Sequence, residues 1–281
     1  MAEADSTAVR TALWRALHLE LEAAPHVFED TLALKLAEPP AGWRERGDMH
    51  PQGTRPFRAS IVGRARFIED LVTREAARGV TQYVLLGAGL DTFAQRRADL
   101  ATRVRVFEID RPEPQAWKRE RLSALGLGMP DHLRFVPIDF EAGASWREGL
   151  TAAGFAANQP AVVASTGVSM YLTRDANRET LAEVAKLAPG STFAMTFLLP
   201  LERADDSARP GLEQSAKGAK ASGTPFISFF EPADLLHMAR DAGFKAVAHV
   251  SAEELTRRYF AGRADGFAPP KNGEEFLVAQ T

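Results

Sequence analysis

The sequence contains no cysteine among its 281 residues, which excludes a disulfide scaffold, thiolate catalysis and metal sites with cysteine ligands. It has no apolar run near the ~18 residues of a membrane-spanning helix, and its first five residues are acidic where a secretion signal would be basic. Positive charge is not in excess, because 34 Lys and Arg face 37 Asp and Glu. We therefore expect a soluble cytoplasmic protein that binds neither nucleic acid nor membranes.

What is present is an ordinary globular composition, 45% hydrophobic and 25% charged. In the first quarter of the chain the apolar residues recur with the period of a helix, and Leu13 and Leu17 share one face, with Trp14 beside them. Helices are predicted over residues 8–22, 30–37 and 57–78, with a proline-rich loop before the third. We interpret residues 1–78 as an N-terminal helical cap, and expect its first helix to roof the active site.

After residue 78 short apolar runs alternate with helical segments. Strands are predicted over residues 83–86, 104–109, 133–138, 161–165, 192–198, 245–250 and 275–280. Helices between them begin at capping residues such as Ser145, Thr173 and Ser251. This alternation predicts an α/β fold with a Rossmann-like, seven-stranded, mostly parallel sheet. We interpret residues 79–281 as one domain, with a lid or insertion at about 199–230.

The first predicted strand leads into Gly87-Ala88-Gly89, followed by a helix. Glycines at these positions permit a tight turn and a close approach of the backbone to a ligand. Glu108 and Asp110 follow 21 and 23 residues after Gly87, the spacing at which a carboxylate accepts hydrogen bonds from a ribose diol. The combination predicts a ligand that contains adenosine.

Two ligands that contain adenosine are compatible with this pattern, a nicotinamide dinucleotide and S-adenosylmethionine. Thr92 occupies the position of the third glycine that a dinucleotide fingerprint requires, and Asp139 with Phe140, after the third strand, suits an adenine. S-adenosylmethionine is therefore favoured. An NAD(P)-dependent oxidoreductase and a non-catalytic cofactor-binding protein are the alternatives.

With these residues in place, the sequence resembles the leucine carboxyl methyltransferase superfamily of class I S-adenosylmethionine-dependent enzymes, and more closely its bacterial polyketide O-methyltransferase branch. The resemblance is carried by residues 64–67, 86–92, 107–110, 117–118, 139–140 and 167–172. It implies the class I methyltransferase fold, in which the last strand is antiparallel, and S-adenosyl-L-methionine as the cofactor.

The resemblance also implies roles for individual residues. Arg64 matches the arginine that pairs with the methionyl carboxylate of the cofactor, and Asp110, or alternatively Glu108, matches the acid at the ribose. Thr166 stands where the family usually has a glutamate that contacts the cofactor. Tyr171 matches a tyrosine on the substrate side. The remaining cofactor positions implied are Gly87, Ala88, Gly89 and Asp91 in the first turn, and Asp139 and Phe140 at the adenine.

The expected partner is a small-molecule methyl acceptor, with either a carboxylate or a hydroxyl oxygen. A carboxylate needs no general base, and arginines of the 38–74 segment could hold it; these are Arg44, Arg46, Arg55, Arg58, Arg64 and Arg66. A phenol would benefit from a base, for which His18 and His237 are the candidates. No metal-ligand spacing is present, and the oligomeric state is left open.

Overall fold

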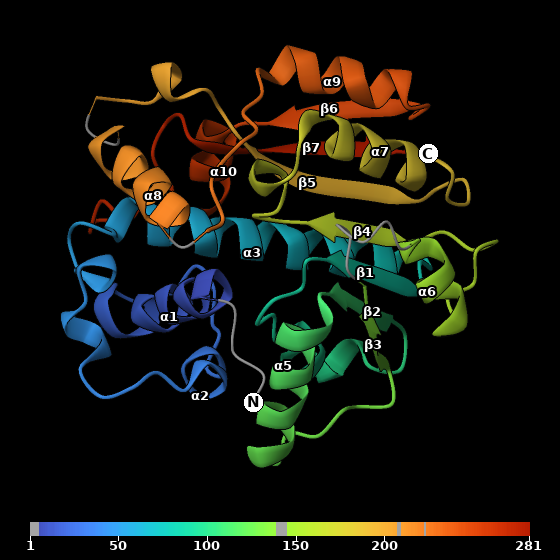
Figure 1. Cartoon of the computed structure of the whole chain (residues 1–281), viewed down its shortest axis with the longest axis horizontal. Coiled ribbons are helices and arrows are strands. Elements are labelled where there is room, and N and C mark those ends of the chain that lie inside the picture. Colours follow the sequence, from blue (N-terminus) through green and yellow to red (C-terminus); the bar gives the residue numbers. More distant parts are fainter. Residues whose placement is uncertain (1–5, 139–144, 207–208, 222) are drawn as a thin grey trace.

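The computed structural model describes residues 6–138, 145–206, 209–221 and 223–281 (Figure 1). Its centre is a seven-stranded sheet in the order β3-β2-β1-β4-β5-β7-β6. Pairing is parallel from β3 to β5, whereas β7 is antiparallel to both β5 and β6. The predicted mostly parallel sheet with an antiparallel last strand is therefore confirmed. The strands are β1 (Gln82–Leu86), β2 (Arg105–Asp110), β3 (Leu133–Pro137), β4 (Val162–Ser165), β5 (Thr192–Leu198), β6 (Ala246–Val250) and β7 (Glu274–Gln280).

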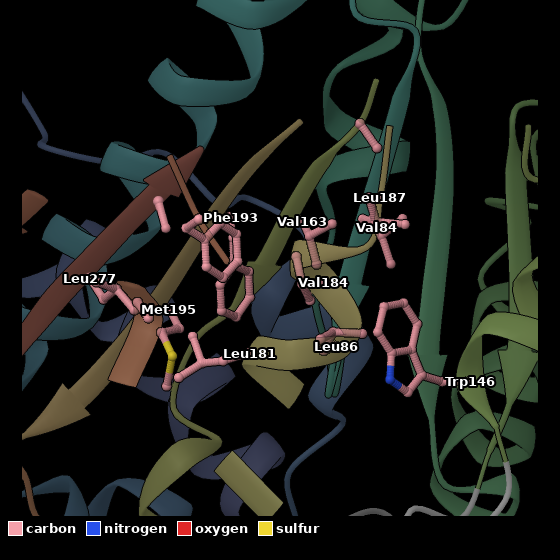
Figure 2. Packing of buried hydrophobic residues seen from close by; sticks show 14 of the residues in the cluster. Val84, Leu86, Trp146, Val163, Leu181, Val184, Leu187, Phe193, Met195 and Leu277 are labelled. Carbon is pink, nitrogen blue, oxygen red and sulfur yellow. The ribbon is translucent and has the colours of Figure 1, made fainter. Parts of the chain in front are cut away.

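Helices cover both faces of the sheet, because successive strand residues point to opposite faces. On one face Val84 and Leu86 of β1 pack in a buried cluster with α6 (Trp146–Ala152), α7 (Arg174–Ala185) and α9 (Pro232–Asp241). Figure 2 shows part of this cluster. On the other face Tyr83 and Leu85 pack with α3 (Arg55–Ala77), α4 (Phe93–Arg96) and α10 (Ala252–Tyr259).

Helix α1 packs against α3 and α2, and α2 packs against α5 (Figure 1). In α1 (Ser6–Leu21), Leu13 and Leu17 are buried in a cluster with residues of α2 (Ala33–Ala37) and α5 (Pro112–Ala124). The indole of Trp14 donates to the Asp48 carbonyl at 2.8 Å, in a loop that contains the short 3₁₀ turns η1 (Trp43–Glu45) and η2 (Gly47–Met49). The remaining 3₁₀ turns are η3 (Ala98–Leu100), η4 (Ser169–Tyr171) and η5 (Leu201–Arg203).

The three predicted capping residues are confirmed, whereas the first three helices begin at Ser6, Ala33 and Arg55 rather than at residues 8, 30 and 57. The hydroxyls of Ser145, Thr173 and Ser251 each accept a hydrogen bond from a backbone N–H three residues later, at 3.1–3.3 Å. None of the described helices combines the length and the apolar character that crossing a bilayer would require.

The 199–230 segment contains an element that the sequence did not predict. Helix α8 (Arg209–Ala221) forms there and is more amphipathic than α1. Its Gly211 lies so close to the Phe57 ring of α3 that a Cβ atom would be 2.6 Å from ring carbons. The contact with α3 supplies a packing partner that local sequence pattern does not reveal.

Candidate active site

A cavity of about 300 Å³ lies where the parallel strands end, between the sheet edge and helices α1 and α3. The loops after β1 and β4 form one wall, together with the end of β2. Because chain connections leave β1 and β4 in opposite directions, this edge is the topological switch point at which α/β proteins bind ligands.

The turn after β1 has the backbone conformation that favours glycine. Gly87 and Gly89 have φ values of 73° and 50°. A Cβ atom at Gly87 would lie 2.6 Å from a Val168 methyl group, so the loops after β1 and β4 could not pack as they do. The N–H groups of Gly87 and Ala88 both donate to the Ile109 carbonyl, at 2.9 and 3.1 Å. All three turn residues line the cavity.

Of the two acids predicted for the ribose, the structure brings only Asp110 to the cavity. Its carboxylate accepts hydrogen bonds from the N–H groups of Gly89 and Arg111, at 2.5 and 2.7 Å. Glu108 points away and is 1% exposed, with Lys118 Nζ 2.5 Å from one carboxylate oxygen. Burial raises the Glu108 pKa to about 7, although Lys118 acts in the opposite direction. Glu108 is therefore a buried partner of α5, and the structure does not support it at the ribose.

Arg64 lines the cavity from α3. Its Nη1 donates to Glu274 Oε1 of β7 at 2.7 Å. The guanidinium lies directly on Gly167, where a Cβ atom would be 2.8–3.1 Å from its atoms. Thr166, next to Gly167, also lines the cavity.

Asp91 and Tyr171 complete the predicted residues that the structure gathers around the cavity. Asp91 Oδ1 accepts from the Phe93 N–H at 2.7 Å and so stabilises the start of α4. The Tyr171 ring makes an edge-to-face contact with Phe226, with ring centroids 5.4 Å apart. Asp139 and Phe140, predicted for the adenine, lie outside the described residues.

The two histidines predicted as bases do not reach the cavity. His18 is 0% exposed. Its Nε2 accepts from the Val27 N–H at 3.1 Å, which leaves the proton on Nδ1 to face Glu22 at 3.2 Å. His237 lies on α9 with its side chain 74% exposed. Neither position supports a role as general base.

Most of the arginines proposed for a carboxylate acceptor also point elsewhere. Of the six candidates in the 38–74 segment, only Arg64 lines the cavity. Arg58 is buried against Glu22, with Nη2 2.5 Å from Oε1. The others bind acids or carbonyls outside the cavity: Arg44 binds Glu20, Arg46 binds Asp48, Arg66 binds Asp70, and Arg55 binds carbonyls of residues 265 and 266.

Sequence reasoning missed a charged network in the cavity wall that joins α1 to the first turn. Asp30 has a fully buried side chain; Arg15 Nε donates to it at 2.8 Å, and Arg15 Nη2 donates to the Leu90 carbonyl at 2.6 Å. Thr92 also donates to Asp30, at 2.8 Å, and Arg96 links Asp30 to Glu69. Burial raises the pKa of Asp30, but Arg15 and Arg96 lower it more, and the net pKa is below the ordinary value. The four charged residues come from separate elements, so no sequence spacing could have indicated them.

The sheet order, with its antiparallel β7, is that of the class I methyltransferase fold. The sequence profile of the leucine carboxyl methyltransferase family matches residues 8–185, which is more than half of the chain. This protein therefore belongs to the leucine carboxyl methyltransferase family and is an S-adenosyl-L-methionine-dependent methyltransferase. The family membership decides against the oxidoreductase and the non-catalytic alternatives.

Similar proteins agree with this family. The chain is 32% identical over 208 residues to YktD of Bacillus subtilis, covering 74% of this chain and 68% of YktD, and 36% identical over 201 residues to FRAAL3718 of Frankia alni, covering 68% of each. Both are named as candidate S-adenosyl-L-methionine-dependent methyltransferases. A solved structure of a candidate methyltransferase from Thermobifida fusca superposes with a TM-score of 0.60 at 16% identity, covering 100% of this chain and 96% of that one, which shows the shared fold.

Proposed function

We propose that this methyltransferase transfers its methyl group to an oxygen atom of a small molecule, either a carboxylate or a hydroxyl. The observation that carries the proposal is the cavity, whose lining includes Arg64, the turn after β1 and Asp110 together with further side chains that could contact an acceptor. These further side chains combine apolar groups with hydroxyls; they include Thr11, Ile61, Tyr171, Leu172 and Thr224. Such a lining suits a small organic molecule.

The predicted cofactor positions fit this arrangement. The Nε and Nη2 groups of Arg64 make no hydrogen bond within the described residues, and a guanidinium is suited to bidentate contact with a carboxylate. Asp110, fixed by two backbone N–H groups, accepts hydrogen bonds from a ribose diol. We propose that these residues hold the amino-acid and ribose parts of the cofactor.

When bound, S-adenosylmethionine supplies an electrophilic methyl group on a sulfonium centre. The protein then has to place the acceptor oxygen in line with the methyl carbon and exclude water. A lone pair of the oxygen forms the new C–O bond, and the electrons of the broken C–S bond stay on sulfur. Helices α1 and α3 close the cavity opposite the sheet edge, which shields the reacting atoms from water.

The proposal is tested by screening the purified enzyme with S-adenosylmethionine against small carboxylates and phenols, with small amines and thiols in the same screen. A carboxylate acceptor should leave kcat nearly flat from pH 6 to 9, because it is already ionised. A hydroxyl acceptor should make kcat rise with pH, through deprotonation of the acceptor or of a base. Methylation found only on nitrogen or sulfur acceptors would contradict the proposal.

His237→Ala is a matched control in that experiment, because this exposed side chain lies outside the cavity wall. The variant should keep the wild-type pH profile.

A further inference from the structure

The ion pair between Arg64 and Glu274 joins two elements that are far apart in the sequence. β7 is antiparallel, so its first residue, Glu274, lies opposite Leu198 at the edge where the parallel strands end. There its carboxylate meets the Arg64 guanidinium at 2.7 Å, with side-chain exposures of 14% for Arg64 and 10% for Glu274. A carboxylate and a guanidinium cation therefore lie in contact at the point where Arg64 borders the cavity.

Both partners keep hydrogen-bonding capacity. Their contact uses Arg64 Nη1 and Glu274 Oε1, while Oε2 of Glu274 has no hydrogen-bond partner among the described residues. Packing on Gly167 holds the guanidinium in place. A nearly buried carboxylate and a guanidinium, each with hydrogen-bonding groups left unpaired, form a site for a ligand that carries both a positive and a negative charge.

The cofactor of this enzyme carries both charges, since its amino-acid end has an ammonium and a carboxylate on the same carbon. We propose that Glu274 is a cofactor-binding residue that receives the ammonium group while Arg64 binds the carboxylate. The inference rests on the proposed placement of the amino-acid end at Arg64. It gives the site an acid in contact with Arg64, whereas Thr166 supplies no charge.

Glu274 itself is not among the residues that line the cavity, but borders it through its contact with Arg64, and the other acids considered for the ammonium, which do line it, make other contacts. Asp30 is paired with Arg15 and Arg96, and Glu69 is paired with Arg96. Asp91 forms no ion pair within the described residues, but one of its oxygens stabilises the start of α4. Asp91 is therefore the appropriate comparison for Glu274.

The inference is tested by calorimetry with two ligands, S-adenosylhomocysteine and 5′-methylthioadenosine, which lacks the amino-acid end. Glu274→Gln should weaken binding of S-adenosylhomocysteine by about 10- to 100-fold, the effect of losing a hydrogen bond to a charged group. Binding of 5′-methylthioadenosine should change by less than about twofold. Asp91→Asn should weaken the two ligands by similar factors.

A rescue variant separates a charge contact from a structural effect. In the Glu274→Gln background, Thr166→Glu places a new carboxylate on the cavity wall and should restore part of the affinity for S-adenosylhomocysteine only. Equal weakening of both ligands by Glu274→Gln, or a loss selective for S-adenosylhomocysteine in Asp91→Asn instead, would overturn the assignment. If Glu274→Gln is selective but Arg64→Ala leaves S-adenosylhomocysteine binding unchanged, the proposed placement at Arg64 fails, and with it the pairing of the two charges.

Discussion

At the scale of single residues, the acids at the end of β2 show how neighbouring positions acquire different roles. Asp110 lies at the cavity and is held by two backbone N–H groups. Glu108 is one of a pair of fully buried charges, and its second oxygen, Oε1, has no hydrogen-bond partner within the described residues. Buried ion pairs with unsatisfied atoms contribute little to stability. We interpret the pair as fixing the position of α5 relative to β2.

Glu108 should make stability depend on pH. Its pKa in the folded protein is about 7, above the ordinary 4.5, so the folded state holds this proton to higher pH than the unfolded state does. This proton therefore adds about 3 kcal/mol to the free energy of unfolding below about pH 4.5, and the added stability is lost as pH rises through 7. Glu108→Gln should remove this dependence. The check is urea unfolding of both proteins at several pH values from 5 to 8; parallel curves for variant and wild type would contradict the prediction.

At the scale of elements, α1 is both a packing element and part of the cavity wall. Leu13 and Leu17 are buried, whereas Thr7, Ala8, Thr11 and Arg15 line the cavity. Deleting residues 1–22 would therefore expose a core cluster and should lower the melting temperature, so truncation cannot isolate the role of the cavity wall. A single substitution of Arg15, which links α1 to Asp30 and to the turn after β1, is more informative.

Arg15→Ala should remove the link between α1 and the turn after β1. It leaves Asp30, whose side chain is fully buried, with Arg96 as its remaining cation, at an expected cost of about 1–3 kcal/mol. Arg15→Ala/Asp30→Asn should recover part of that loss, because it also removes the buried charge. Chemical unfolding of the two single variants and the double variant measures the coupling. Additive effects in the double variant would show that the two residues do not act together.

At the scale of the whole molecule, the cavity is built from both halves of the chain. Its walls come from α1 and α3 of the N-terminal helices and from the loops after β1, β2 and β4. A ligand that fills the cavity contacts all of these elements only in the folded state.

S-adenosylhomocysteine should therefore stabilise the whole protein. At 100 times its dissociation constant it should add about 2.7 kcal/mol to the free energy of unfolding. Thermal unfolding over a series of ligand concentrations checks this, with 5′-methylthioadenosine compared at the same multiple of its own dissociation constant. A melting temperature that does not change with S-adenosylhomocysteine would contradict binding at this site.

Much of the fold was predictable from the sequence, because its signals are local. Alternating apolar runs predicted the strands, and capping residues such as Ser145 and Ser251 predicted where helices begin. The glycines after β1 were also identified from sequence, since they follow a strand and precede a helix. Helix α8 was not predicted, and its close contact with Phe57 of α3 is long-range, so it leaves no local signal in the sequence.

The sequence by itself determined the class of sheet, the positions of its strands and the turn that borders the cavity, because hydrophobic period and turn chemistry act over a few residues. Only the tertiary structure decided which charged side chains meet in the cavity. Arg64 and Glu274 are 210 residues apart, and Arg15, Asp30 and Arg96 come from separate segments. His18 matched a possible base in sequence, but burial against Glu22 removed it from the site. Long-range pairing and burial depend on the packing of whole elements, which residue spacing does not encode.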